Sequence, residues 1–339
     1  MKKINYKIIG LKTLAAALCL LVFACKKNDE EASTSAEGTL VKPNYNRSTT
    51  FRNPLNGWVM YGSGTATPSY WDTEYYVPDL GKKVKAIDYA SACYIRTRWA
   101  NFNPTNGVYA WRDPNSALYK MIKGAQDRGL PIAFRIVVDG RDQGLNTPQF
   151  VFDAGAKYIT EDPRFPDRRT PLPQDPIFRQ HYAKFIEELA KDFNDPNKTS
   201  FIDAYGLGKW GEAHNVIYQD PAAPTGQSTE VMKEEVMDWI SDVYVKNFTK
   251  IPLVINYHRV VGDPVSWGAA NPNSDRLLTK LINKGYSLRQ DAFGMTDYYQ
   301  SWEKAFAKTW NFKRPILMEG GWITSGTHRY WTDPSGKYR

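Results

Sequence analysis

Two glutamates occupy positions where a carboxylate could take part in a reaction. Glu212 follows the apolar segment Phe201–Leu207, and Glu319 closes the apolar segment Pro315–Glu319. Each has a glycine beside it and a tryptophan within three residues. A carboxylate buried at such a place is costly unless it is paired or used in chemistry. A single glutamate would more simply cap a helix or form an ion pair, but two at matching strand ends favour a catalytic pair.

Short apolar segments alternate with helical patterns through most of the chain, and these elements must position the two glutamates. The predicted strands are short, rich in β-branched and aromatic residues and bounded by turn formers: Trp58–Tyr61, Cys93–Arg98, Ile132–Val138, Phe201–Leu207, Leu253–His258, Ala292–Tyr298 and Pro315–Glu319. Apolar residues at helical spacing predict helices over Ile177–Phe193 and Thr229–Phe248. Asn273 or Ser274 would cap a further helix that ends before Gly285.

This alternation predicts the α/β class with a parallel sheet, either open or closed into a barrel. The favoured fold is a (β/α)8 TIM-type barrel with seven of its eight strands recognisable. Both glutamates would then lie at the C-terminal ends of strands, where such barrels have their catalytic mouth. The segment Asp139–Pro176 has no clear period and is expected to overhang that mouth. Because the chain stops soon after the seventh strand, either the eighth unit is missing or the count is wrong, and we prefer the first interpretation.

The N-terminus predicts export and lipid attachment. A basic leader precedes the apolar run Thr13–Ala24, which is too short to span a bilayer of about 30 Å but fits a signal-peptide core. The run ends at Cys25, in a context that resembles the bacterial lipobox, whose cysteine is lipidated. The alternative is an ordinary secretory signal with a chance cysteine.

The predicted organisation has three parts: a lipoprotein signal peptide over residues 1–24, a lipid-anchored flexible tether over 25–50 and a catalytic barrel domain over 51–339. The tether is rich in Ser, Thr, Ala and Glu and cannot bury a core. Its acidic start resembles the surface-export signal of lipoproteins in the Bacteroidetes. We therefore expect an exported protein, anchored by its lipid at the outer membrane and facing the cell surface.

Composition argues against several other functions. The formal net charge is +8, but four of the lysines lie in the leader and no dense Lys/Arg stripe remains, so a nucleic-acid partner is not expected. The four histidines show no metal-ligand spacing, so we expect neither a metal nor another cofactor. Of the three cysteines only Cys93 would remain free after processing and lipidation, which excludes an intrachain disulfide. The 11 Trp and 21 Tyr suit stacking on sugar rings but are also ordinary core residues.

Four short segments resemble the retaining glycoside hydrolases of clan A, closest in style to β-galactosidase-like barrels. They are Asn53–Trp58, Arg98–Trp111, Lys209–His214 with its Trp-Gly-Glu motif, and Asp297–Tyr299. The resemblance implies a (β/α)8 barrel in which Glu212, at the fourth strand, is the general acid/base and Glu319, at the seventh, is the nucleophile. The chain departs from the family pattern at Gly211, where the clan usually has the asparagine that binds the sugar 2-hydroxyl.

The resemblance implies a double displacement on an oligo- or polysaccharide. Glu319, ionised, would attack the anomeric carbon while Glu212, protonated, donates to the leaving oxygen, and water would then hydrolyse the glycosyl-enzyme. Retention requires the two carboxyl groups to lie about 5–5.5 Å apart. For this role the pKa of Glu212 must be raised above the ordinary value of about 4.3, and the negative charge of Glu319 would help to raise it.

Further polar and aromatic residues near the predicted strand ends are candidates for binding the carbohydrate. They are Arg98, Arg135, Asn256, His258, His214, Tyr298 and Trp322. An arginine at the top of a barrel could orient a catalytic carboxylate through a bidentate bond, although an internal ion pair explains Arg96, Arg98 and Arg135 equally well. Trp99 could stack on a sugar or belong to the core, and Asp139 is a reserve candidate for a carboxylate role.

Two competing interpretations remain open. The first is a surface glycan-binding protein built on the same barrel but without turnover, which Gly211 and the missing eighth strand both favour. The second is a nonfunctional fragment of a larger enzyme.

Overall fold

The computed structural model describes residues 58–62, 68–139, 144–160, 162–213, 216–256, 274–293, 314 and 316–320. They belong to one compact unit that spans Thr50–Arg339. The predicted signal peptide and tether, with Cys25, lie outside the described residues. None of the described helices is long and apolar enough to cross a membrane.

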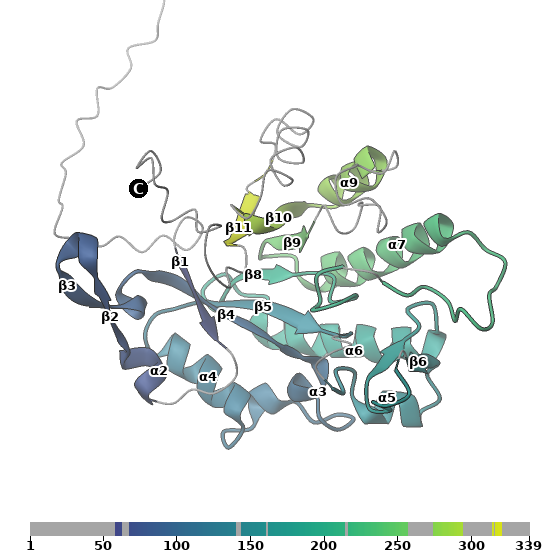
Figure 1. The fold of residues 1–339 in the computed structure, drawn as a ribbon, viewed down its shortest axis with the longest axis horizontal. Helices are drawn as coiled ribbons and strands as arrows, with labels where there is room; N and C mark the ends of the chain where they lie inside the picture. Colours follow the sequence, from purple (N-terminus) through teal and green to yellow (C-terminus); the bar gives the residue numbers. More distant parts are fainter. Residues whose placement is uncertain are drawn as a thin grey trace, which may run out of the picture. The chain divides into compact units, whose positions relative to one another are not determined.

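Seven parallel strands form one curled sheet in the centre of the fold (Figure 1). They are β1 (Trp58–Gly62), β4 (Ala90–Arg98), β5 (Ile132–Val137), β8 (Thr199–Asp203), β9 (Leu253–Asn256), β10 (Tyr286–Phe293) and β11 (Ile316–Gly320). Each strand pairs with the next of this series in sequence order, and every pairing is parallel. Sequential parallel neighbours are the strand order of a (β/α)8 barrel, of which the described residues contain seven strands. The predicted fold class is confirmed.

Six of the predicted strands agree with the structure to within a few residues, but the sixth was placed wrongly. It was predicted over Ala292–Tyr298, whereas β10 covers Tyr286–Phe293. The observed strand contains Arg289 and three further polar residues, Ser287, Gln290 and Asp291, which interrupt the apolar pattern on which the prediction relied. The fourth strand ends earlier than predicted, at Asp203, because the backbone then enters a glycine-rich turn.

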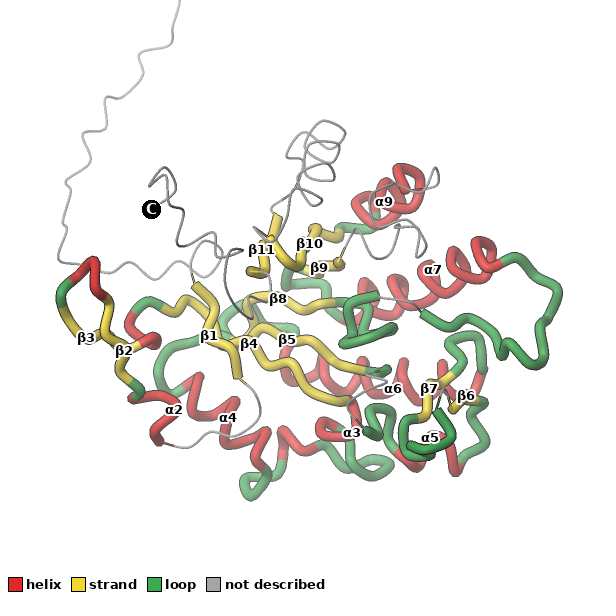
Figure 2. Tube along the Cα trace, viewed as in Figure 1, coloured by secondary structure: helices red, strands yellow, loops and turns green. Residues whose placement is uncertain are grey.

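Helices cover the outer face of this sheet, as Figure 2 shows for the red segments beside the yellow strands. The long ones are α4 (Ala117–Gln126), α6 (Pro176–Phe193), α7 (Thr229–Asn247) and α9 (Ser274–Asn283). Ser116, Asp175 and Ser228 cap the first three by accepting hydrogen bonds from backbone N–H groups. Gly285 follows α9 with φ +100°, as predicted for a helix end. The predicted helices over 177–193 and 229–248 are confirmed.

Shorter elements complete the described part of the unit. The helical turns are α2 (Pro68–Asp72), α3 (Trp99–Phe102), α5 (Gln149–Asp153), η1 (Pro78–Leu80), η2 (Ala86–Asp88) and η3 (Ala110–Arg112). Two antiparallel hairpins pair β2 (Glu74–Val77) with β3 (Lys82–Lys85) and β6 (Tyr158–Thr160) with β7 (Arg169–Pro171). The second hairpin and α5 belong to the segment that follows β5, for which the sequence predicted no regular period.

Side chains alternate between the two faces of the sheet with the period of two that strands impose. On the outer face, residues such as Ile95, Phe134 and Ile202 join the large core shared with the helices. On the inner face, Tyr94, Ala133, Phe201 and Val254 form a separate small apolar cluster, against which Leu317 packs. The inner positions two residues further along the strands are polar, and they contain the candidate site.

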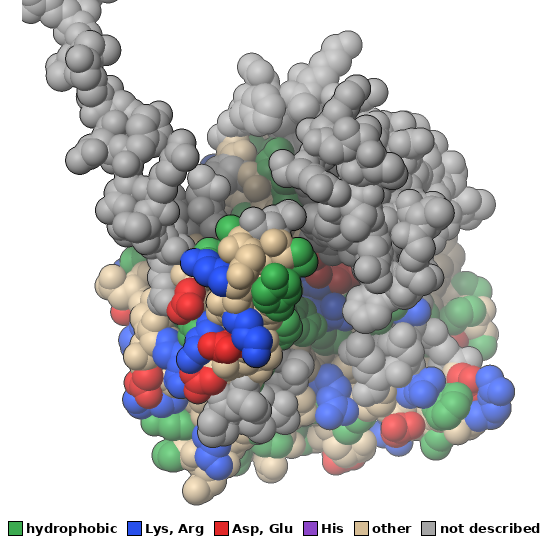
Figure 3. Space-filling view, turned by 60° about the vertical axis from the view of Figure 1, so that its left-hand side comes forward, with side chains coloured by type: hydrophobic (Ala, Val, Ile, Leu, Met, Phe, Trp, Pro, Cys, Tyr) green, Lys and Arg blue, Asp and Glu red, His purple; other side chains and the backbone are tan. Residues whose placement is uncertain are grey.

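Trp99 belongs to the outer core rather than to a sugar-binding surface. Its side chain is fully buried, and its ring lies 5.1 Å from that of Tyr182 and 5.5 Å from that of Phe185. Asp139 is also buried and accepts a hydrogen bond from Thr170 Oγ1 at 3.1 Å, which ties the end of β5 to β7. On the face drawn in Figure 3, basic and acidic side chains are interspersed among apolar ones.

Gly206 offers a test of the turn that ends the fourth strand. Its φ is +77°, and a Cβ atom there would lie 2.6 Å from Tyr182 Oη and 2.9 Å from the Ile136 carbonyl oxygen. We expect Gly206→Ala to lower the free energy of unfolding by roughly 2–5 kcal/mol, because left-handed strain and overpacking add. Urea unfolding measures the change.

The matched control is Gly226→Ala. Gly226 has nearly the same φ, +79°, but a Cβ atom added there would find no other atom within 4 Å among the described residues. Its substitution should cost only the backbone strain, about 1–2 kcal/mol. Equal losses in the two variants would contradict the close packing around Gly206.

Candidate functional site

The guanidinium of Arg135 lies at the centre of the polar layer inside the barrel. Its side chain is 0% exposed, and it contacts three carboxylates at once. Nε donates to Asp203 Oδ2 at 2.8 Å, Nη1 donates to Glu212 Oε1, and Nη2 donates to Glu319 Oε2 at 2.7 Å. Arg135 therefore brings together the two glutamates that the sequence singled out. These contacts are compatible with both interpretations of Arg135 drawn from the sequence, the orientation of a catalytic carboxylate and an internal ion pair.

A second buried arginine closes the network into a ring. Arg289 Nη1 donates to Glu319 Oε2, and Arg289 Nε forms an ion pair with Asp203 Oδ2 at 2.8 Å. Asp203 and Glu319 are thus each shared between Arg135 and Arg289. Asp203 is 1% exposed and Arg289 3% exposed, whereas the Glu319 side chain is 31% exposed. The ring runs from the barrel interior to an accessible carboxylate.

The strand register explains why these side chains meet. Arg135 on β5 pairs in register with Arg96 on β4 and with Asp203 on β8, so all three project from the same inner face. Arg289 on β10 pairs with Asn256 on β9 in the same way. Glu319 lies two residues beyond Leu317, the β11 residue that pairs with Arg289. The polar layer is therefore built by period-two alternation above the apolar inner cluster.

Glu212 reaches the network from a loop rather than from a strand end. It lies nine residues after β8 ends at Asp203, in a turn where Ala213 N–H donates to the Leu207 carbonyl at 2.9 Å. The residues around it adopt left-handed backbone conformations, with φ +60° at Trp210 and +61° at Ala213. Non-glycine residues held in this region store strain, which is frequent at functional sites. The prediction that Glu212 ends the fourth strand is corrected by this loop.

Gly211 cannot be replaced by the asparagine of the clan A pattern without rearrangement. Its φ is +71°, and a Cβ atom there would lie 3.0 Å from the Ile136 carbonyl oxygen and 3.5 Å from Arg135 Cγ. A side chain at this position would therefore press on the backbone of β5 and on the central arginine. The departure noted in the sequence is a requirement of the loop conformation.

The charges of the layer balance. Arg96 Nη1 lies 3.7 Å from Glu212 Oε1, so three guanidinium groups face three carboxylates. Burial opposes the charge of Arg135, but the surrounding acidic groups, among them Asp203 and the two glutamates, raise its pKa well above the ordinary value. Burial raises the pKa of Tyr94, whose ring lies 5.3 Å from Arg135 Cζ, so its phenol stays neutral.

Some of the predicted substrate-binding residues lie among the described residues, and others do not. Asn256 is 1% exposed on the inner face of β9, and both atoms of its amide lack a hydrogen bond in the described structure. Arg98 lies at the end of β4, where α3 begins, and it is Arg96 that the structure places at Glu212. The remaining candidates lie outside the described residues: His214, His258, Tyr298 and Trp322.

Sequence reasoning missed Asp203 and Arg289 as members of the site. Arg289 was missed because the sixth strand was predicted too late in the sequence. Asp203 was missed because only residues at the predicted end of the fourth strand were considered as candidates. The signal that they share with Arg135 is a charged residue inside a strand-like segment. Such a residue is too costly to bury alone and must therefore find opposite charge inside the fold.

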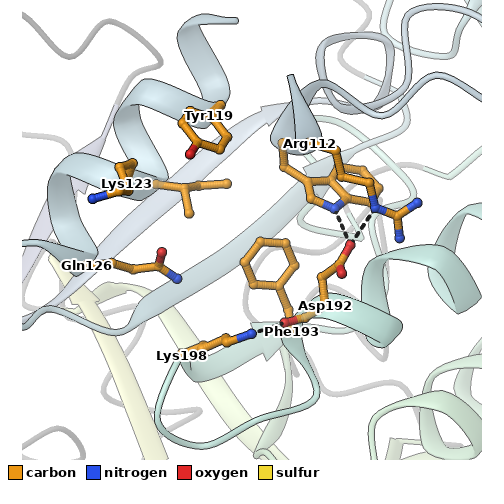
Figure 4. Close-up of a pocket in the computed structure, with 9 residues that line it drawn as sticks. Arg112, Tyr119, Lys123, Gln126, Asp192, Phe193 and Lys198 are labelled. Atoms are coloured by element: carbon orange, nitrogen blue, oxygen red, sulfur yellow. Dashed lines mark hydrogen bonds and ion pairs between the residues drawn. The ribbon is translucent and has the colours of Figure 1, made fainter. Parts of the chain in front are cut away.

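One hollow in the described structure lies on the outside of the barrel, away from this layer. It has a volume of about 220 Å³ and lies between η3, α4 and the C-terminal end of α6 (Figure 4). Trp111 Nε1 and Arg112 Nε both donate to Asp192 Oδ2 on its wall, at 2.8 and 2.7 Å. None of the ring residues lines it, so we do not assign the chemistry to it. The described residues contain no group of His, Cys, Asp and Glu that could hold a metal ion.

Comparisons with known proteins find distant structural similarity only. No protein-family model matches the sequence, and no curated protein matches it. Among solved structures, an endo-1,4-β-xylanase from Caldicellulosiruptor owensensis is 8% identical, with a TM-score of 0.38 over 79% of this chain and 85% of the xylanase. Endo-glycoceramidase II from Rhodococcus sp. is 14% identical, with a TM-score of 0.38 over 81% of this chain and 73% of that enzyme.

A psychrophilic glycoside hydrolase family 10 endo-β-1,4-xylanase is 10% identical, with a TM-score of 0.39 over 81% of this chain and 90% of its own. These similar structures are glycoside hydrolases, but likeness at this level assigns no function. The function proposed below rests on the site itself.

Removal of the Arg135 guanidinium should lower the free energy of unfolding, because the buried carboxylates lose a positively charged partner. In Arg135→Met, Asp203 and Glu212 lose their main partner, and we expect the free energy of unfolding to fall by about 3–5 kcal/mol. Without the arginine, folding raises the pKa of these carboxylates above the unfolded values of about 4. The variant should therefore lose further stability as the pH rises above about 4, while the wild type should not. Urea unfolding at pH 5 and pH 8 measures both effects.

Arg276→Met provides the control. Arg276 is 53% exposed and pairs with Glu234 on the surface, so its loss should cost at most about 1 kcal/mol with little pH dependence. Equal losses of stability in both variants at both pH values would show that the buried network contributes no more to stability than the surface pair of Arg276.

Proposed function

We propose that this protein is a glycoside hydrolase that acts by a retaining double displacement, with Glu319 as nucleophile and Glu212 as general acid/base. One observation carries the proposal: the guanidinium of Arg135 bridges the two carboxylates at the inner face of a parallel barrel. The terminal nitrogens of one guanidinium share a carbon atom, so the two carboxylates that they bind are held close together. This arrangement is compatible with the separation of about 5–5.5 Å that retention requires.

The two carboxylates differ in the elements that carry them and in the arginines that they contact. Glu319, on β11, accepts hydrogen bonds from two guanidinium groups, and as the nucleophile it attacks the anomeric carbon in its ionised form. Glu212 lies on a loop, with Arg135 and Arg96 on one of its oxygens, Oε1. Its other oxygen, Oε2, is the one that we assign to proton transfer.

The reaction then proceeds in two steps. In the first, Glu319 forms a bond to the anomeric carbon while Glu212 gives its proton to the departing glycosidic oxygen. In the second, Glu212 takes a proton from water, the water oxygen bonds to the anomeric carbon, and Glu319 departs as a carboxylate. Glu212 must therefore be protonated in the first step and ionised in the second.

Asn256 and Arg98 are proposed to contact the carbohydrate, together with His214, His258, Tyr298 and Trp322. Asn256 has the strongest support, because its buried amide has no hydrogen-bond partner among the described residues and lies beside Arg289 in the register. An unpaired buried amide costs about 1–3 kcal/mol, which a substrate hydroxyl would recover. A β-galactoside is the first substrate to try, given the resemblance of the sequence to β-galactosidase-like barrels.

A glycan-binding protein without turnover is the second candidate. It is favoured by Gly211, which supplies no side chain for the sugar 2-hydroxyl, and by the positive charges of Arg135 and Arg96 beside Glu212, the proposed acid. The two candidates differ in one measurable respect, because only the enzyme releases a reducing sugar.

Glutamate substitutions test the assignment. With aryl β-glycosides, β-galactosides first, we expect Glu319→Gln to abolish turnover, since an amide cannot form the glycosyl-enzyme. Glu212→Gln should lower kcat/KM about 10²–10⁴-fold for substrates with poor leaving groups and much less for good ones, which need no proton. Release of nitrophenol and of reducing sugar measures the rates.

Glu187→Gln is the matched control, because Glu187 is a surface residue that is 58% exposed. It should leave the rates unchanged. Full activity in Glu319→Gln would show that the nucleophile is wrongly assigned, and saccharide binding without any turnover by the wild type would favour the second candidate.

We also propose that the protein is exported and anchored in the outer membrane through lipid on Cys25. The support is the sequence of the leader, in which an apolar run ends at Ala24-Cys25. In cells, Cys25→Ser should move the protein from the membrane fraction to the soluble fraction and prevent incorporation of labelled fatty acid. Cys19→Ser, a substitution within the leader, should change neither. Membrane retention of Cys25→Ser would exclude this anchor.

A further inference from the structure

The two arginines that reach Glu319 bind the same oxygen atom. Arg135 Nη2 lies 2.7 Å from Glu319 Oε2, and Arg289 Nη1 donates to the same Oε2. No described contact engages Oε1 of Glu319. The carboxylate is therefore presented asymmetrically, with one oxygen held by two positive charges and the other left open on a side chain that is 31% exposed.

We propose that Arg289 is a positioning residue, which together with Arg135 selects Oε1 of Glu319 as the attacking atom. The inference rests on the proposed function, in which Glu319 is the nucleophile. Two charge-assisted hydrogen bonds engage the lone pairs of Oε2 and fix the plane of the carboxylate. Oε1 keeps its lone pairs available for attack.

Asp203 holds Arg289 in position beside Glu319. Arg289 Nε lies 2.8 Å from Asp203 Oδ2, and Arg135 Nε donates to the same oxygen at 2.8 Å. The two guanidinium groups are thus tied together at both ends, by Asp203 deep in the barrel and by Glu319 toward the mouth. Burial and the charge of Arg135 lower the pKa of Arg289, but attraction to Asp203 and Glu319 outweighs them and raises it. Arg289 stays charged although it is almost fully buried.

The arginines act on Glu319 in both steps of the proposed reaction. In the first step a lone pair of Oε1 forms the bond to the anomeric carbon, the bond to the glycosidic oxygen breaks, and the proton of Glu212 goes to that oxygen. Oε2 becomes the carbonyl oxygen of the ester and continues to accept from both arginines. In the second step the pair of the C–Oε1 bond returns to Glu319, while Glu212 takes the proton of the attacking water. Arg289 stabilises the carboxylate that departs and thereby favours this step.

A positioning role predicts effects that a purely structural role does not. Loss of Arg289 removes one positive charge from Glu319, so the carboxylate should be protonated at a higher pH than in the wild type. The acid limb of the pH–activity profile should then move to higher pH. Substrate binding should change little, because the Arg289 side chain is only 3% exposed.

The test compares Arg289→Gln and Arg289→Lys with the surface control Arg276→Gln in the full chain. We expect Arg289→Gln to lower kcat about 10²-fold with KM changed less than about twofold, and to displace the acid limb upward. Arg289→Lys keeps the positive charge and should retain more activity with a smaller displacement of the limb. An unchanged acid limb in Arg289→Gln, even with lower stability, would overturn the proposal.

A second measurement does not depend on turnover. In protein labelled with ¹³C at glutamate carboxyl carbons, the Glu319 resonance is assigned by its loss in Glu319→Gln, and its titration is followed in wild type and in both Arg289 variants. We expect Glu319 to titrate at higher pH in Arg289→Gln than in the wild type, with Arg289→Lys between them. Identical titration in all three would refute the role of Arg289. If the wild type turns over no glycoside, the proposed function fails, yet this titration still decides whether Arg289 controls the charge on Glu319.

Discussion

The buried guanidinium of Arg135 is the constraint on which the rest of the site depends. A charged group that is 0% exposed must be surrounded by opposite charge, and Arg135 obtains it from Asp203, Glu212 and Glu319. These carboxylates come from the fourth strand, the loop after it and the seventh strand, so one side chain links distant parts of the chain. The curled sheet surrounds this contact with its inner face, which is therefore not entirely apolar.

The backbone near Glu212 is shaped by the same requirement. To bring its carboxylate to Arg135, the chain after β8 turns sharply through residues with positive φ, including Gly206, Gly211 and Ala213. Gly211 lies against the β5 carbonyl and Arg135, which leaves no space for an asparagine side chain. The site therefore keeps the two glutamates of the pattern that the sequence resembles and departs from that pattern between β8 and Glu212. A retaining hydrolase and a glycan-binding protein are therefore both chemically reasonable. The property that distinguishes them is the ability of Glu212 to donate a proton to the leaving oxygen.

Much of the fold could be predicted from the sequence, because hydrophobic periodicity and caps are local. The helices after Asp175 and Ser228 are marked by their capping residues and by apolar stripes. The prediction failed at β10, where inward-facing Arg289 makes a strand look like a polar loop. A local pattern cannot show that a charge is buried, because its partners, Asp203 and Glu319, lie far away in the sequence.

The sequence by itself determined the strand–helix alternation, the pairing of Glu212 with Glu319 as candidates, and the glycine at 211. Only the tertiary structure decided that Arg135 bridges the two glutamates, that Arg289 and Asp203 complete a ring with them, and that Glu212 stands on a loop. The physical reason is that register between parallel strands sets which inner side chains become neighbours, and register depends on the packing of the whole sheet. Residue type shows which groups can react, while the sheet determines which of them meet.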